Sequence, residues 1–470
     1  MNDFESLDYF GDDDHKGHKK NRNKEELEKI LKLEEEAKKS FDPENLEEII
    51  NFYFENNDYD KALSYVNVFL DIYPYSTEAW HKKALILDSL GKFEEAVEYF
   101  DKAILLDPTD TEIYINKGIT LDNFENFDAA QECFLKAIEI EPENTDAIFN
   151  MGLTFEKMEK FSEAAECFEN VLLLDENHRD SYYELGYCFD FLDKTKESVD
   201  AYEKHLNYSP GNYTAWYNKG IVLNRMGRYL KAIESYEMCL AIRDNFASAW
   251  YNCGNAYASL GRLYKAIEYY KKALELKKTD SFTLHNLGNA YEELGEYPTA
   301  IEYFSESIKI DSHNYESYYG RGNCYFNLCN YEKALDDFNS ALILCKDYSE
   351  IWYLKADCEQ ALGRLEDSIK SYEMVVKLES TNHEAWYDYG KALLSAKMYE
   401  SALNAFDNVI TNHGYWEDPY YQKAKIYFLS EKIDLGIEML EKGFDLNPMD
   451  RFEYDFDKDW KLVMKFLINV

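Results

Sequence analysis

The chain has 470 residues, 46% of them apolar and only 8 of them proline, a composition that supports a buried core and excludes a proline-rich extended chain. Acidic residues outnumber basic ones 91 to 51, which gives a formal net charge of −40 at pH 7. Nucleic acid and anionic membrane surfaces repel such a charge, so neither is expected as a direct partner. No apolar run reaches the roughly 18 residues of a membrane-spanning helix, so no insertion into a bilayer is expected.

The cysteines and the first residues indicate a reducing compartment. Nine cysteines are present, an odd number without a C-x-x-C pair, which fits neither a disulfide framework nor a zinc site. Residues 1–5 lack the basic and apolar segments of a secretory signal. We therefore expect a cytoplasmic protein.

Residues 1–23 are predicted to form a disordered tail in which the charge changes sign. Residues 1–14 hold six acids and no base, whereas residues 15–24 hold five bases and no acid. Large apolar and aromatic side chains lie among the acids: Phe4, Leu7, Tyr9 and Phe10. Two interpretations stay open, a solubilising tail and a motif that binds a partner.

Residues 24–42 and 451–470 are predicted to form helices that cover the two ends of a repeat array between them. Leu27, Ile30 and Leu31 share one helical face in the first segment. A stripe at helical spacing runs through the second segment: Trp460, Val463, Met464 and Leu467. Each stripe would cover apolar surface that the terminal units of an open array expose.

Residues 43–450 repeat with a period of 34 residues, twelve times without an insertion or deletion. The glycines reveal the period, because eight of the 20 fall in one register and five more in a register seven residues later. With Pro43 or Thr77 as position 1, position 8 is glycine or alanine in eleven repeats, and Ile50 is the exception. Position 20 is always small, and position 24 is aromatic in ten repeats.

Each repeat is predicted to form two amphipathic helices, A and B. Apolar residues at positions 4, 7, 8 and 11 follow the spacing of one helical face, and those at 20, 24, 27 and 28 follow it again. Glycine at position 15 suits a left-handed cap that ends helix A, because only glycine adopts this conformation at low cost. Small residues at positions 8 and 20 would let the two backbones approach, while large rings fill the remaining space.

The segment Trp250-x-x-Cys253-Gly254-x-x-Tyr257, followed by Ala266-x-x-x-Tyr270, resembles the tetratricopeptide repeat. The resemblance covers 408 of the 470 residues. It implies an all-α fold, an α-solenoid in which helical hairpins form a right-handed superhelix and the A helices line a concave groove.

The fifth repeat departs from the family pattern. It has Asp193 at the glycine position 15, and Ser198 and His205 where the family has small residues. Its helix pair is therefore expected to pack loosely.

The sequence does not indicate catalysis, a cofactor or a metal site. Only 62 residues lie outside the repeats, too few for a catalytic domain. Cys188, Cys324 and Cys358 recur at position 10, which is typical of buried hydrophobic residues rather than of a nucleophile. The nine histidines form no H-x₃-H pair, and no phosphate loop or G-x-S-x-G motif is present. A non-enzymatic protein is therefore expected.

Positions 2, 5, 6, 9, 12 and 13 lie mostly away from the packed face of helix A, and the family binds ligands there. Position 12 is acidic in repeats two to five, although a carboxylate in the last turn opposes the helix dipole. Asparagine at positions 6 and 9, beside tyrosine at position 5, suits a peptide backbone because an amide both donates and accepts. The predicted groove residues are Asp88, Asp122, Glu156, Asp190, Tyr217, Asn218, Tyr251, Asn252, Asn255, Asn286, Asn289, Tyr319 and Asn323.

Alternatives to these groove assignments stay open. The acids are also explained as solvated charge, and the Trp-Tyr-Asn pattern is close to the average sequence of the family. One ligand class is not expected: the family's clamp on the terminal carboxylate of chaperone tails needs lysine at positions 2 and 5, and no repeat has it there.

The sequence therefore predicts a scaffold whose groove holds an extended segment of a partner protein or peptide. That segment would be basic over repeats two to five and neutral further along. The alternative is a structural or assembly subunit that uses its convex face or its ends inside a larger complex.

Overall fold

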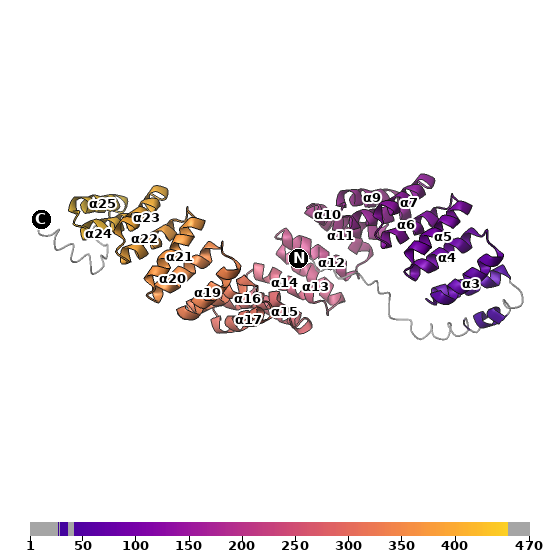
Figure 1. Cartoon of the computed structure of the whole chain (residues 1–470), viewed down its shortest axis with the longest axis horizontal. Coiled ribbons are helices and arrows are strands. Elements are labelled where there is room, and N and C mark those ends of the chain that lie inside the picture. The colour runs from indigo at the N-terminus through magenta and orange to yellow at the C-terminus, as the bar shows by residue number, and fades with distance from the viewer. Residues whose placement is uncertain (1–26, 28, 36–41, 450–470) are drawn as a thin grey trace. The chain divides into compact units, whose positions relative to one another are not determined.

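The computed structural model describes residues 27, 29–35 and 42–449, and every regular element in this part of the chain is an α-helix (Figure 1). Each repeat folds into an A helix followed by a B helix, so the predicted all-α solenoid is confirmed. The A helices are α2 (Pro43–Glu55), α4 (Thr77–Ser89), α6 (Thr111–Asn123), α8 (Thr145–Lys157), α10 (Arg179–Phe191), α12 (Tyr213–Arg225), α14 (Ala247–Ser259), α16 (Ser281–Glu293), α18 (Tyr315–Asn327), α20 (Ser349–Ala361), α22 (His383–Ser395) and α24 (Asp418–Leu429). The B helices are α3 (Tyr59–Ile72), α5 (Phe93–Leu106), α7 (Phe127–Ile140), α9 (Phe161–Leu174), α11 (Thr195–Tyr208), α13 (Tyr229–Ile242), α15 (Leu263–Leu276), α17 (Tyr297–Ile310), α19 (Tyr331–Leu344), α21 (Leu365–Leu378), α23 (Tyr399–Asn412) and α25 (Ile433–Leu446).

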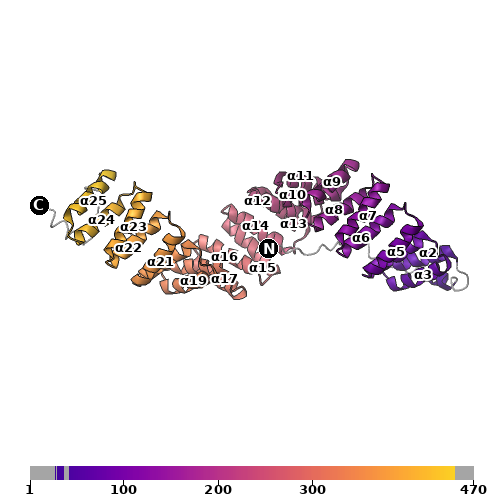
Figure 2. The same ribbon diagram turned by 45° about the horizontal axis from the view of Figure 1, so that its top comes forward.

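The helices belong to two compact units, Met1–Met226 and Gly227–Val470, and the boundary falls between α12 and α13. Within each unit, the two helices of a hairpin pack together, and each B helix packs against the A helix that follows it. Neighbouring A helices also touch, for example α4 with α6 and α16 with α18, so the A helices line one face of each stack. We call this surface the A-helix face. Figure 2 shows the hairpins following one another in chain order within each unit.

Most A helices begin at a side chain that caps their free N–H groups. Ser76 Oγ accepts a hydrogen bond from the Ala79 N–H at 3.2 Å, and Asn144 Oδ1 accepts from the Ala147 N–H at 3.0 Å. These capping residues occupy position 34 of the preceding repeat. The last residue of one repeat therefore sets where the A helix of the next repeat begins.

The turn between helices A and B contains one residue with a left-handed backbone in all twelve repeats. This residue is always position 15, with φ between 57° and 75°. Five of the twelve are glycine, as the glycine register predicts, and the others are Asn57, Glu125, Glu159, Asp193, Cys329, Lys397 and Glu431. A side chain at such a φ costs roughly 1–2 kcal/mol, because Cβ comes too close to the carbonyl oxygen. Packing of the two helices therefore imposes this turn even where glycine is missing.

We predict that Glu159→Gly stabilises the protein by about 0.5 kcal/mol or more, because glycine relieves the strain of a φ of 59°. Glu132→Gly is the matched control, since Glu132 is exposed in the interior of α7 and glycine there costs about 1 kcal/mol. Urea unfolding followed by circular dichroism measures both. A fall in the unfolding midpoint for Glu159→Gly would contradict the strain argument.

The two helices of a hairpin approach each other at a glycine that faces an aromatic ring. A Cβ placed on Gly152 would lie 2.7 Å from Cε1 of Phe168, well inside van der Waals contact. The same clash with a position-24 ring is found at six further position-8 glycines: Gly118, Gly186, Gly254, Gly288, Gly322 and Gly390. In the first repeat, position 8 is Ile50 and position 24 is Val66. In this repeat a larger side chain at position 8 is therefore combined with a smaller one at position 24, and the volume between the helices stays filled.

We predict that Gly152→Ala destabilises the protein by about 1–3 kcal/mol, because the new methyl group overlaps the ring of Phe168. Adding Phe168→Leu should recover part of this loss, so the double variant costs less than the sum of the single variants. Gly211→Ala is the control, since a Cβ at Gly211 has no atom within 4 Å. Additive effects in the urea midpoints of the double-mutant cycle would contradict this packing role.

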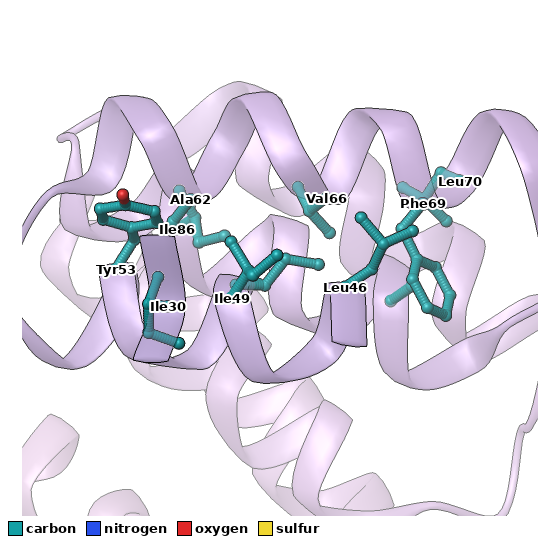
Figure 3. Close-up of a cluster of buried hydrophobic side chains, with 11 residues drawn as sticks. Ile30, Leu46, Ile49, Tyr53, Ala62, Val66, Phe69, Leu70 and Ile86 are labelled. Carbon is teal, nitrogen blue, oxygen red and sulfur yellow. The ribbon is translucent and has the colours of Figure 1, made fainter. Parts of the chain in front are cut away.

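Residues 29–35 are helical and cover the first hairpin. Ile30 is 2% exposed and joins the hydrophobic core of this hairpin (Figure 3). The Glu34 carboxylate accepts hydrogen bonds from the hydroxyl groups of Tyr53 at 2.8 Å and Tyr65 at 2.9 Å. The segment thus supplies both apolar and polar contacts to the outer side of the first repeat.

Other parts of the predicted domain plan lie outside the described residues. These are the tail 1–23, the C-terminal capping helix 451–470 and part of the segment 24–42. The domain boundaries, including 43–450 for the repeats, stay predictions.

The fifth repeat differs from the loose packing expected for it. Ser198 is fully buried, and its hydroxyl donates to the Gly186 carbonyl oxygen at 2.7 Å. His205 is 2% exposed, with its Nδ1 2.8 Å from the Arg179 carbonyl oxygen and its Nε2 3.0 Å from Asn212 Nδ2. Hydrogen bonds thus satisfy the polar side chains that replace small residues.

Candidate functional site

The residues predicted for the groove lie on the A-helix face in two separate sets. The first set lies on α4 to α12, in the unit that ends at Met226, and the second lies on α14 to α18, in the other unit. Many of these side chains bond to a neighbouring repeat, and this decides which polar atoms remain for a ligand.

Two of the four acids at position 12 are neutralised by the repeat that follows. Asp122 is 8% exposed, accepts a hydrogen bond from Thr154 Oγ1 at 2.7 Å and forms an ion pair with Lys157. Asp190 pairs with Arg225, whose charge opposes the increase that burial causes in the pKa of Asp190. Lys157 and Arg225 both occupy position 13 of the next repeat. Cations of the chain itself therefore contact these two acids.

The other two acids each keep a carboxylate oxygen without a partner. Asp88 Oδ1 and Glu156 Oε2 are buried and have no hydrogen-bond partner among the described residues. The third such side-chain atom in the described part is Oδ1 of Asn224, which is position 12 of the sixth repeat. Buried polar atoms are nearly always hydrogen-bonded, so three exceptions at one register position of alternate repeats point to a common cause.

Glu156 faces a second carboxyl group, Glu184, across α8 and α10. Burial raises the pKa of Glu156 to about 7, while a hydrogen bond with Glu184 and the charge of Lys157 oppose the increase. Burial also raises the pKa of Glu184 well above its usual value, and the charges of Glu156 and Asp180 add to this effect. Near neutral pH, the two carboxyl groups therefore retain a proton between them.

Position 5 of one repeat bonds to position 6 of the next repeat. Asn218 Nδ2 donates to the Tyr183 hydroxyl oxygen at 3.2 Å, and Asn286 Nδ2 donates to the Tyr251 hydroxyl oxygen at 3.1 Å. The same positions join His81 with Asn116 and Tyr353 with Asp388. Among the other predicted residues, burial and the nearby carboxylate of Glu350 raise the pKa of Tyr319, and Tyr217 and Asn252 interact with other groups of the chain. This ladder ties neighbouring A helices together.

The position-9 asparagines use one end of each amide inside the protein. Asn255 Oδ1 accepts from the Tyr270 hydroxyl at 2.8 Å and from Asn286 Nδ2 at 2.9 Å. The Asn255 Nδ2 group makes no such bond among the described residues, so it is left to donate to a ligand.

The next two asparagines have the opposite arrangement. Asn289 Nδ2 lies 2.9 Å from Nε2 of His285, and Asn323 Nδ2 donates to Glu292 Oε1 at 2.6 Å. Their Oδ1 atoms are left as acceptors within the described part of the chain. The three amides together therefore present both donors and acceptors on the A-helix face.

Three further carboxyl groups and one amide on the A-helix face were not among the residues predicted from the sequence. Glu184 and Asp388 occupy position 6, and Glu292 and Asn224 occupy position 12. The register that identified the predicted residues contains all four of them. It does not reveal which of them the neighbouring repeat leaves without a partner.

The described residues contain no group of three His, Cys, Asp or Glu side chains placed to hold a metal ion. Burial raises the pKa of Cys133 to about 11 and of Cys167 to about 12, which keeps both thiols protonated at neutral pH. No described helix is both long and apolar enough to cross a membrane.

We predict that unfolding becomes easier as the pH rises from about 5 to 8, through the Glu156–Glu184 pair. Both carboxyl groups have a raised pKa in the folded state, so the folded protein binds more protons there than the unfolded chain does. The free energy of unfolding therefore falls as the pH rises through these pKa values. Glu184→Gln removes the charge, so it should raise the urea midpoint at pH 8 and flatten its pH dependence.

Glu163→Gln is the matched control, because Glu163 is an exposed carboxylate on α9. It should leave the pH dependence of the parent protein unchanged. Parallel curves of urea midpoint against pH for the parent and Glu184→Gln would contradict the role of the carboxyl pair.

Comparison with known families supports the repeat assignment. Family models described as tetratricopeptide repeat match residues 77–110, 111–144, 145–178, 180–212, 212–279, 245–313, 315–348, 353–415 and 418–449. No curated protein matches the sequence.

Several solved structures resemble parts of the chain. The structure of MamA is 29% identical, covers 36% of this chain and 92% of its own, and has a TM-score of 0.35. YrrB, described as a TPR protein with an unusual peptide-binding site, is 26% identical, covers 39% of this chain and 94% of its own, and has a TM-score of 0.37. The C-terminal part of a TPR repeat-containing protein from Cytophaga hutchinsonii is 18% identical, covers 50% of this chain and 97% of its own, and has a TM-score of 0.45.

Proposed function

Because the chain belongs to the tetratricopeptide repeat family, we propose that it is a non-enzymatic cytoplasmic scaffold that binds an extended segment of a partner protein on its A-helix face. Stretches bound by repeats two to five, in the first unit, are basic, and stretches bound by repeats seven to nine, in the second unit, are neutral. Each repeat contributes a few polar contacts to it.

The unpartnered acceptors at position 12 carry this proposal. Asp88, Glu156 and Asn224 each hold a buried oxygen without a hydrogen-bond donor, although each residue is half-exposed as a whole. A ligand that donates hydrogen bonds would satisfy these oxygens after a small rotation of the side chain. Lysine and arginine side chains are donors only, and their positive charge is attracted to the two carboxylates.

The four position-12 acids therefore do not contribute equally to the basic subsite. Asp122 and Asp190 already have internal cations, so a ligand would gain little by approaching them. Asp88 and Glu156 lack such cations at their open oxygens, so the cations of the ligand are proposed to lie there.

The neutral half of the site rests on the position-9 amides. Asn255 offers N–H donors, whereas Asn289 and Asn323 offer oxygen acceptors. A peptide backbone carries both complementary groups in each residue. Repeats seven to nine are therefore suited to an extended backbone irrespective of its side chains.

We predict that Asp88→Asn combined with Glu156→Gln weakens binding of a basic peptide about tenfold, which corresponds to about 1.4 kcal/mol. The probe is a fluorescent synthetic peptide with lysine at every third residue and glycine between, titrated into the full chain and followed by anisotropy. The variant should also show a weaker salt dependence of binding, because two attracting charges are lost.

Asp122→Asn combined with Asp190→Asn is the matched control, since it removes two acids of the same register that are already paired. It should change the affinity less than twofold or threefold, within the ordinary effect of an exposed pair. Equal losses for the two double variants would overturn the assignment of Asp88 and Glu156. Full binding by both variants at low salt would show that the A-helix face is not the basic-peptide site.

Cation binding at Glu156 also requires loss of the proton that it shares with Glu184. The affinity of the parent chain for the same peptide should therefore increase between pH 6 and pH 8, because Glu156 has a pKa of about 7. The double variant Asp88→Asn with Glu156→Gln should lose this increase. If the variant kept the pH dependence of the parent chain, titration of Glu156 would not be the cause of the change in peptide affinity.

A further inference from the structure

The charge of the repeats changes sign in the middle of the chain. Ten of the twelve repeats have a net charge between −2 and −6, but residues 213–246 hold five bases against three acids, and residues 247–280 hold six against three. These are the two positive repeats in an array whose full chain has a net charge of −40. Their basic surface has no role in the proposed function.

The bases gather where two B helices begin. Arg228 and Lys231 flank exposed Leu230 at the start of α13, and the start of α15 repeats this order with Arg262, Tyr264 and Lys265. Leu230 is 55% exposed and Tyr264 is 74% exposed. We call these six residues the basic edge: Arg228, Leu230, Lys231, Arg262, Tyr264 and Lys265.

The basic edge lacks compensating charges. Neither α13 nor α15 has an acid in its first turn, and in neither helix does a backbone N–H donate a hydrogen bond to the N-cap side chain. The side chains of Arg228, Lys231 and Arg262 have no hydrogen-bond or ion-pair partner among the described residues, whereas Lys265 pairs with Glu268 at 2.8 Å. Cations at a helix N-terminus oppose the helix dipole, so this arrangement is unfavourable until an anion approaches. The exposed leucine and tyrosine add apolar surface between the charges.

We propose that the basic edge binds the acidic N-terminal segment, residues 1–14, of a second copy of this chain. That segment holds six acids and no base. It also contains large apolar and aromatic side chains, of the same type as the exposed leucine and tyrosine: Phe4, Leu7, Tyr9 and Phe10. Both partners thus combine one sign of charge with large apolar side chains. The association is separate from ligand binding on the A-helix face, because it uses the starts of B helices.

A peptide segment suits the basic edge better than nucleic acid or an anionic membrane does. The edge spans the starts of two helices, and the repeat that follows has Glu296, Tyr297, Pro298 and Thr299 at the corresponding positions. A nucleic acid or an anionic membrane would extend over that repeat and the later ones, whose acids would repel it. Salt screens charges beyond about 8 Å at physiological ionic strength, so a short acidic segment responds mainly to the local bases.

Cross-linking between isotopically distinct copies tests this association. Equal amounts of unlabelled and ¹⁵N-labelled full chain are mixed and treated with a carbodiimide, which joins carboxylates to lysine amines. We expect pairs that carry both isotopes, linking an acid of residues 1–14 to Lys231 or Lys265. We also expect sedimentation to show salt-sensitive self-association. A monomer at all concentrations, or links confined to copies of one isotope, would overturn the proposal.

A charge-reversal series separates specific docking from misfolding. Arg228→Glu combined with Arg262→Glu should weaken self-association at least about tenfold, because like charges then face each other. The control is Lys333→Glu with Arg364→Glu, two exposed bases at positions 19 and 16 of repeats nine and ten, and it should leave self-association unchanged. Reversing three acids of the tail, Asp12→Lys, Asp13→Lys and Asp14→Lys, should restore association of the Arg228→Glu, Arg262→Glu variant. Equal loss in the control, or no restoration by the reversed tail, would overturn the proposal.

Discussion

One contact inside the hairpin governs the rest of the structure: the aromatic ring at position 24 lies where a side chain at position 8 would be. The ring of Phe168 against Gly152 shows how close the two backbones come. This closeness sets the angle of the connecting turn, so position 15 adopts a left-handed backbone even at Glu159, where a side chain is strained. Because the contact recurs in most repeats, nearly every hairpin joins its neighbours in the same way, and register positions face the same partners along each unit.

The polar chemistry of the A-helix face follows from this regular stacking. Position 5 faces position 6 of the next repeat, and position 12 faces positions 10 and 13 of the next repeat. Most polar side chains therefore have an internal partner supplied by the neighbouring repeat. Where the neighbour supplies no donor, as at Glu156, which faces the carboxyl group of Glu184, one oxygen is left without a partner, and we propose that ligands bind at such positions. Differences between otherwise similar repeats thus decide which polar atoms are left without an internal partner.

An array of this kind can carry different surfaces on different helices. The A helices of repeats two to five present acids, and the B-helix starts at Arg228 and Arg262 present bases. The two surfaces lie on different repeats that share the same helix pattern, so opposite charges coexist without altering the packing. Such separation is what the proposed binding of a basic segment and of an acidic segment requires.

The sequence by itself determined the period, the two helices of each repeat, their turn at position 15 and the ring-and-glycine packing between them. These features depend on residues within one repeat, and their spacing repeats often enough to be recognised. It also located the candidate polar residues by register. The partners of those residues required the tertiary structure, because the ion pair of Asp122 joins it to Lys157, 35 residues away in the next repeat. The open oxygens of Asp88 and Glu156 depend on the same contacts between repeats, since a side chain is free to bind a ligand only after its neighbours have taken their hydrogen bonds.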